Sequence, residues 1–253
     1  MIYISQLLET DELEKLLKAY PMGLEIISFS IGYLLDDLEK NINAYEKEFK
    51  NLRGQVPFSF HGPFLDLLPG SCDDKVRSLA RERFEAGHKA AKAFGAKQMI
   101  FHTGYIPNTY PDKYWLENTI LFWKEFLKEK LEDCFFYVEN VLDTDYELLK
   151  RLVEAMDHPH FKVCLDIGHI NAYSKRPVQE WIKGLGDLIG YVHLHNNDGT
   201  KDGHKSLIRG TIPMEEVLYL LKEKAPQAHW SLEIGDKEEL QESINWLIDK
   251  KFL

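Results

Sequence analysis

The sequence contains few cysteines and no long apolar run. Its three cysteines, Cys72, Cys134 and Cys164, are odd in number and show no C-x-x-C spacing. Neither a disulfide framework nor a zinc site built from thiolates is therefore supported. No apolar run approaches the roughly 18 residues that span a bilayer, and the opening "MIYISQLLETDELEK" has no basic segment before its short apolar stretch. We expect a cytoplasmic protein with no membrane partner.

Clustered positive charge is also missing. The formal net charge is −10, and lysines and arginines are scattered along segments such as "KVRSLARERFEAGHKAAK" rather than gathered in one basic run. Proteins that hold nucleic acid through its phosphates usually present a basic face. Duplex DNA is therefore not the expected partner, and a small-molecule substrate is.

The chain has no Pro/Gly/Ser-rich linker, so we predict one domain over residues 1–253. Short β-favouring runs alternate with segments of helical periodicity, at about 32 residues per repeat, which is the size of a βα unit. The predicted fold is a single (β/α)8 TIM barrel. Its expected strands are "MIYIS", "GLEIISF", "VPFSFHG", "AKQMIFHTG", "CFFYVEN", "FKVCLDIGH", "IGYVHLHNN" and "HWSLEIGD". Its expected helices lie near residues 11–19, 37–51, 73–94, 112–130, 144–157, 177–184, 213–224 and 237–251.

Six of the eight strand candidates finish with a side chain that can bind a metal. The carboxyl ends of barrel strands meet at one mouth, so these side chains should converge. They are His61, His102, Glu139, Asp166, His193 and Glu233. Three more candidates join them: His169 follows Asp166 in a turn, and Asp202 and His204 lie in the long segment near residues 196–213.

This set of nine side chains predicts a metal centre. Carboxylates gathered at one face repel one another and raise their own pKa values unless cations neutralise them. A mixture of imidazole and carboxylate suits zinc, manganese or iron better than calcium or magnesium. Zinc is the first expectation. Because one zinc ion takes about four ligands, we expect more than one ion per chain.

The motifs "HGPFLDL", "FHTG", "VEN", "LDIGH", "HLHNNDG", "DGH" and "LEIG" resemble those of the xylose isomerase-like TIM barrels, the superfamily of sugar isomerases, sugar epimerases and zinc apurinic endonucleases. The resemblance implies two ligand sets. Sugar isomerases and epimerases hold one metal with four side chains, which match Glu139, Asp166, His193 and Glu233. The endonucleases hold three metals with nine side chains, and all nine candidates match.

The endonuclease-like set implies metal-assisted phosphoester hydrolysis. In that resemblance Glu139 bridges two ions and Glu233 holds or orients the attacking water. The acidic chain fits a small sugar-containing phosphorylated substrate, such as a phosphodiester.

Two alternatives stay open. A sugar isomerase or epimerase would use one metal, with Glu139 and Glu233 moving protons to and from carbon. A barrel that binds a metabolite without turnover is the third hypothesis.

Four further residues are predicted to contact the substrate. Phe64 and Leu65 follow His61 and are expected to line the pocket, although related endonucleases push bulky side chains from this loop into DNA. Lys205 and Arg209 are cations in the same long segment as Asp202 and His204, and we expect them to contact a phosphate.

Overall fold

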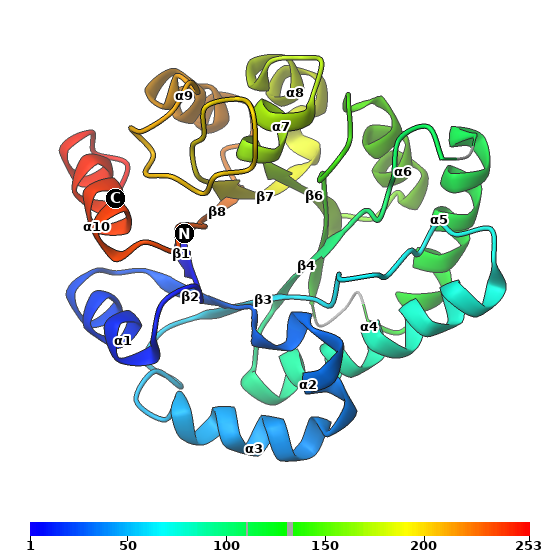
Figure 1. Cartoon of the computed structure of the whole chain (residues 1–253), viewed down its shortest axis with the longest axis horizontal. Helices are drawn as coiled ribbons and strands as arrows, with labels where there is room; N and C mark the ends of the chain where they lie inside the picture. Colours follow the sequence, from blue (N-terminus) through cyan, green and yellow to red (C-terminus); the bar gives the residue numbers. More distant parts are fainter. Residues whose placement is uncertain (110, 131–133) are drawn as a thin grey trace.

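The computed structural model describes residues 1–109, 111–130 and 134–253. Eight parallel strands form a closed barrel in sequence order, and the eighth strand pairs with the first. Helices surround the barrel, as the view down its axis shows (Figure 1). The predicted (β/α)8 TIM barrel is confirmed.

All eight predicted strands are present, each shorter than the run that predicted it. They are β1 (Ile2–Ser5), β2 (Gly23–Ile26), β3 (Phe58–His61), β4 (Gln98–His102), β5 (Phe135–Glu139), β6 (Phe161–Asp166), β7 (Ile189–Leu194) and β8 (His229–Leu232).

The eight predicted helices are also present. They are α1 (Thr10–Ala19), α3 (Leu38–Glu48), α4 (Asp74–Phe94), α5 (Asp112–Phe126), α6 (Glu147–Met156), α8 (Val178–Leu185), α9 (Met214–Lys224) and α10 (Lys237–Asp249). Two short helices were not predicted: α2 (Gly32–Asp36) and α7 (Ile167–Tyr173). In the described ranges, no helix is both long enough and apolar enough to cross a bilayer.

The strand period of two builds the floor of the mouth. Side chains two positions apart on a strand point the same way, so the residue two before each strand-end donor also faces the barrel interior. Four of those six residues pack with Tyr3 of β1 as one buried cluster beneath the donors, and the other two are the buried serines Ser59 and Ser231. The cluster is Tyr3, Ile100, Tyr137, Cys164 and Tyr191.

A second core lies between the barrel and its helices and is rich in aromatic rings. Phe84 on α4 stacks near Phe101 on β4, with ring centroids 4.3 Å apart. Trp123 on α5 lies 5.4 Å from Phe101, and all three side chains are at most 1% exposed. Burial of such rings contributes about 1.5–3 kcal/mol each, which fixes the outer helices against β4.

Helix α10 holds the long segment that follows β7. The carboxylate of Glu239 accepts a hydrogen bond from the Ser206 backbone nitrogen at 2.7 Å. The helix begins at a capping residue, Asp236, whose Oδ1 accepts from the backbone nitrogens of Glu238 and Glu239, both at 3.0 Å. The position of this segment therefore depends on the capped first turn of α10.

Replacing Asp236 with alanine should lower the free energy of unfolding by about 1 kcal/mol, because two backbone donors lose their acceptor. Asp236→Asn is the matched control, since its carboxamide oxygen can accept the same bonds. Urea unfolding measures both. If the two variants lose equal stability, the aspartate acts through its charge and not as a cap.

Candidate metal centre

The structure brings the nine predicted side chains together at the carboxyl end of the barrel. Register explains part of this: His102 pairs with Glu139 across β4 and β5, and Asp166 pairs with His193 across β6 and β7. One position differs from the prediction, because His169 belongs to α7 and not to a turn. Asp166 caps that helix by accepting from the His169 backbone nitrogen at 2.6 Å.

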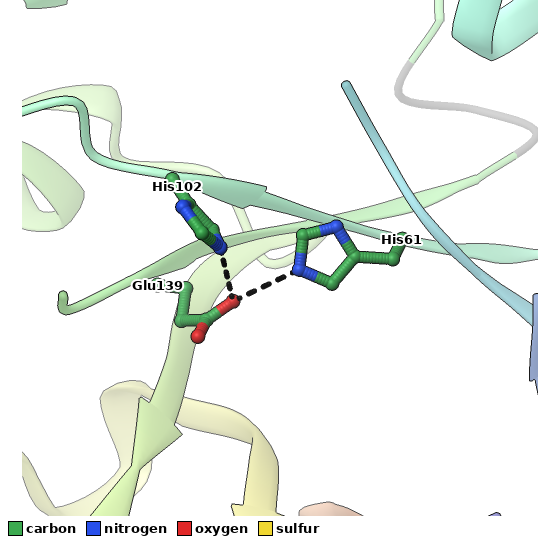
Figure 2. A group of neighbouring side chains, drawn as sticks. All are labelled: His61, His102 and Glu139. Carbon is green, nitrogen blue, oxygen red and sulfur yellow. Dashed lines mark ion pairs between the residues drawn. The ribbon is translucent and has the colours of Figure 1, made fainter. Parts of the chain in front are cut away.

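The first of three groups contains His61, His102 and Glu139 (Figure 2). Both imidazoles point their Nε2 atoms at one carboxylate oxygen, Glu139 Oε2, at 3.3 Å for His61 and 3.5 Å for His102. Glu139 is 1% exposed. Three potential ligand atoms thus face a common point at the end of three neighbouring strands.

The central group surrounds the other side of the same carboxylate. His193 Nδ1 lies 3.3 Å from Glu139 Oε1, 3.8 Å from Asp166 Oδ2 and 3.7 Å from Glu233 Oε2. Glu139 therefore presents one oxygen to each group. A carboxylate in this position can bridge two ions.

The outer group is built on Asp202. Its Oδ2 atom lies 3.3 Å from His169 Nε2 and 2.8 Å from His204 Nε2. His204 has a positive φ of 44°, a backbone conformation that non-glycine residues seldom adopt and that is often found at functional sites.

Backbone carbonyls select the nitrogen that each imidazole offers. The Nδ1 atoms of His61, His169 and His204 lie 2.8 to 2.9 Å from the carbonyl oxygens of Gly62, Asn140 and Glu233. An Nδ1–H that donates to a carbonyl leaves Nε2 as the free nitrogen, and metal-binding histidines are usually held in this way. In all three residues the free nitrogen faces a carboxylate of the site.

His193 is held the other way round, by a residue that was not predicted to act in the site. Its Nε2 lies 3.0 Å from Oε1 of Glu25, a fully buried carboxylate on β2. Tyr191 and Ser5 each donate a hydroxyl hydrogen bond to Glu25 Oε2 at 3.2 Å. Glu25 therefore orients His193 so that Nδ1 faces the central group. Side chains alternate between the two faces of the strand in "GLEII", which places Glu25 inside the barrel. This alternation was the sequence signal that could have identified Glu25 as part of the site.

His195 and Asn140 were also missed. His195 Nε2 lies 3.2 Å from both oxygens of Asp166. A Cβ atom at Gly168 would lie 1.9 Å from the His195 ring, so glycine is needed in "LDIGH". The Asn140 side chain joins the backbone of Asp166 through two hydrogen bonds of 2.9 Å. Both residues hold Asp166 in place.

The donor set fits a metal ion by a test that is independent of resemblance. Buried polar atoms normally have hydrogen-bond partners. Among the described residues, Glu139 Oε2, His193 Nδ1 and Asp202 Oδ1 are buried and have none. These atoms face the groups described above, where a divalent cation would satisfy them.

Burial and neighbouring charge shift the pKa values here strongly. Burial alone would raise the pKa of Glu139, but the imidazole of His193 holds it well below its usual range. Burial lowers the pKa of His102 to about 3, so this imidazole is neutral and ready to bind a cation. Burial opposes protonation of His204, but Asp202 raises its pKa to about 9.

A cavity of about 580 Å³ opens above the donors. Phe64 lines it, whereas the next residue in the chain, Leu65, is 57% exposed. Lys205 pairs with Glu239 at 3.2 Å, and Arg209 pairs with Glu242 at 2.8 Å. Among the described residues, the lining includes Phe64 but not Leu65, Lys205 or Arg209. Contact of the last three with substrate stays a prediction.

A parallel barrel with clustered imidazoles and carboxylates at the carboxyl ends of its strands is the architecture of a metal-dependent TIM-barrel enzyme. Residues 8–250 match the family described as the xylose isomerase-like TIM barrel. The chain belongs to this family.

Curated relatives include an uncharacterized protein of Methanocaldococcus jannaschii, 27% identical over 237 residues, covering 85% of this chain and 75% of that protein. The probable endonuclease 4 of Mycobacterium leprae is 25% identical over 198 residues, covering 73% of this chain and 77% of that protein.

Solved structures give a second comparison. A D-tagatose 3-epimerase-like protein superposes with a TM-score of 0.82 at 25% identity, covering 98% of this chain and 96% of that one. A Thermus thermophilus protein, whose crystals were soaked with zinc chloride, superposes with a TM-score of 0.80 at 22% identity, covering 98% of this chain and 97% of that one.

Replacing Glu25 with glutamine should weaken metal binding by about 10- to 100-fold, because His193 loses the negative charge that raises its basicity. Tyr191→Phe is the matched control: it removes one hydrogen bond to Glu25 and keeps the carboxylate beside His193. Titration against a competing chelator measures both affinities. Equal affinity in E25Q and wild type would contradict an orienting role.

Metal binding should release protons, and the affinity should rise with pH. Burial alone would lower the pKa values of His169 and His193, but Asp166 near the first, and Glu233, Glu25 and Glu139 near the second, raise them well above the usual value. A protonated nitrogen cannot bind a metal, so the ion must displace its proton. Zinc titration calorimetry in buffers of different ionisation enthalpy counts these protons. Zero release between pH 6 and pH 8 is the contrary result.

Proposed function

We propose that this protein hydrolyses a phosphoester bond in a small, sugar-containing phosphorylated substrate, with the help of more than one bound divalent ion. The observation that carries the proposal is the division of nine donors into three groups. One zinc ion takes about four ligands, so the donors exceed the needs of a single ion. Zinc is the expected metal, with manganese or iron as alternatives.

Each group has side chains that can hold an ion. His61, His102 and one oxygen of Glu139 form the first group. The other Glu139 oxygen, with Asp166, His193 and Glu233, forms the second. His169, Asp202 and His204 form the third. Glu139 belongs to two groups, which supports the bridging role that the resemblance implied.

Bound divalent ions supply positive charge to phosphoryl oxygens and lower the pKa of a water ligand to near neutrality. The chain's own residues position the reactants. Glu233 lines the cavity, and its side chain is 12% exposed, so its carboxylate can reach a water beside the substrate and take its proton. Glu25, Asn140 and His195 keep the donors in place from behind.

The cavity favours a small substrate. Its volume of about 580 Å³ lies within the range of small-molecule sites. Its described lining contains no lysine or arginine, and the chain carries a net charge of −10. Duplex DNA, with many phosphates outside any metal site, is not the proposed partner.

Sugar isomerisation or epimerisation is the second candidate, and the solved structures favour it more than they favour hydrolysis. The D-tagatose 3-epimerase-like protein superposes with a TM-score of 0.82 over 98% of this chain and 96% of its own. This reaction needs one ion in the central group. We rank it second because one barrel serves many reactions and because it leaves the other two groups without a purpose.

The double variant Asp202→Ala/His204→Ala separates the two candidates, because only the multi-metal proposal needs the third group. It should lose one ion per chain and cut hydrolysis of bis(p-nitrophenyl) phosphate by about a hundredfold or more. Elemental analysis and the colour of released p-nitrophenol measure these effects. Asp198→Ala is the control, since Asp198 lies in the same segment and bonds only to Thr200 among the described residues.

A different result would select the second candidate. In that result, the double variant keeps its metal content and interconverts ketoses at the wild-type rate. One ion between Glu139 and Glu233 would then support sugar isomerisation or epimerisation.

A further inference from the structure

Two cavities, not one, open beside the first group of donors. The larger, about 580 Å³, lies over the ends of β1 and β2, and the smaller, about 280 Å³, lies over the segments that follow β3, β4 and β5. Phe64 and His102 line both. Their rings stack with centroids 4.2 Å apart and an interplanar angle of 26°, so this pair forms the partition. The three donors line the larger cavity, and of them only His102 also lines the smaller one, so a group held there would reach the smaller cavity past the Phe64–His102 pair.

The walls of both cavities are largely apolar. Leu7, Ile31 and Tyr33 line the larger cavity and are 37%, 37% and 68% exposed. Ile106 and Leu142 line the smaller one and are 38% and 39% exposed. Large apolar side chains kept at the surface around a cavity mark a binding surface.

Apart from the imidazoles of the metal donors, neither wall offers, among the described residues, a side chain that can carry positive charge. In the described lining of both cavities there is no lysine or arginine, and the smaller cavity has an acidic residue, Asp66. A charged group placed against these walls would lose hydration without gaining a counter-ion, which is costly. Only the metal centre in the larger cavity can therefore receive the negative charge of a substrate.

Gln6 provides one fixed polar contact in the larger cavity. Its Oε1 accepts from the backbone nitrogens of Ile27 and Ser28, both at 3.2 Å, and from the Ser28 hydroxyl at 2.8 Å. Backbone nitrogens only donate, so this atom must be the carboxamide oxygen. The NH₂ group takes part in no hydrogen bond with the described residues and is the donor left for a ligand.

We propose that the site takes a small phosphodiester with two uncharged arms, the larger a ring with a hydrogen-bond acceptor that faces Gln6. This inference rests on the proposed hydrolysis and names its substrate class. The phosphate would lie at the metal centre, one arm would occupy each cavity, and Phe64 and His102 would separate them.

The reaction is balanced with water as the only other reactant. The water oxygen bonds to phosphorus, one P–O ester bond breaks, and the leaving oxygen takes a proton. The products are an alcohol and a phosphate monoester. A monoester substrate would leave one cavity empty, and a nucleic-acid strand would place its flanking phosphates against walls without cations.

A panel of four p-nitrophenyl phosphates tests the arms, with the metal-loaded protein and the same leaving group throughout. The thymidine 5′-diester should be hydrolysed with the highest kcat/KM. The methyl diester, which lacks the ring, should be about tenfold slower, mainly through KM. The thymidine diester with an added 3′-phosphate should be about tenfold slower. The monoester p-nitrophenyl phosphate should be about a hundredfold slower.

Gln6→Glu tests the polar contact. The variant keeps an oxygen for the backbone donors of Ile27 and Ser28 and removes the NH₂ group. KM for the thymidine diester should rise about tenfold, and KM for the methyl diester should stay within about twofold. Both diesters carry one negative charge, so simple repulsion would affect them equally. Gln55→Glu is the matched control, because this exposed residue precedes β3 at the opposite end of the barrel.

The outcomes separate this inference from the proposed function. Cleavage with the expected order, and a Gln6→Glu effect confined to the thymidine diester, supports both. Three results would overturn the inference alone, provided that the protein cleaves the esters. The monoester is cleaved as fast as the diesters, the added 3′-phosphate accelerates the reaction, or Q6E affects both diesters equally. No cleavage of any ester by metal-loaded protein overturns both.

Discussion

The structure depends on one electrostatic constraint: five carboxylates lie together at one end of a single barrel. Glu25, Glu139 and Asp166 are at most 1% exposed, and the side chains of Glu233 and Asp202 are 12% and 19% exposed. Ionised carboxylates in such surroundings need opposite charge close by. The six imidazoles of His61, His102, His169, His193, His195 and His204 surround them, and the arrangement of strands, capping bonds and hydrogen bonds at the mouth serves to hold these groups together.

The barrel meets this constraint by holding four of the six imidazoles with partners outside the donor set. Backbone carbonyls hold His61, His169 and His204, and the Glu25 carboxylate holds His193. Each ring is therefore fixed in one orientation with one nitrogen free. Rings held in this way lose little freedom when an ion binds, so the protein has already met much of the entropic cost of metal binding during folding.

The mouth combines this polar centre with apolar walls. Ions held at the donors would supply positive charge, while Lys205 and Arg209 in the segment after β7 pair with Glu239 and Glu242 on α10. An acidic protein can bind an anionic group under these conditions, provided that the anion is small and lies at the metal centre. The division of the mouth by Phe64 and His102 adds a shape requirement to this charge requirement.

The repeated βα pattern and the strand-end donors could be predicted from the amino-acid sequence alone. Both are local properties: strand runs are recognised by composition, and His61, His102, Glu139, Asp166, His193 and Glu233 each lie at or just beyond the end of one run. The carboxyl ends of the strands in a barrel must meet, so the clustering of these donors followed without knowledge of any contact.

The division and the support of the donors could not be predicted in this way. The place of Glu25 behind His193 depends on β2 and β7 facing each other across the barrel, 168 residues apart in the chain. The engagement of Lys205 and Arg209 depends on the position of α10 against a distant segment. Such contacts are set by three-dimensional packing between elements far apart in the chain, and no pattern within one segment records them.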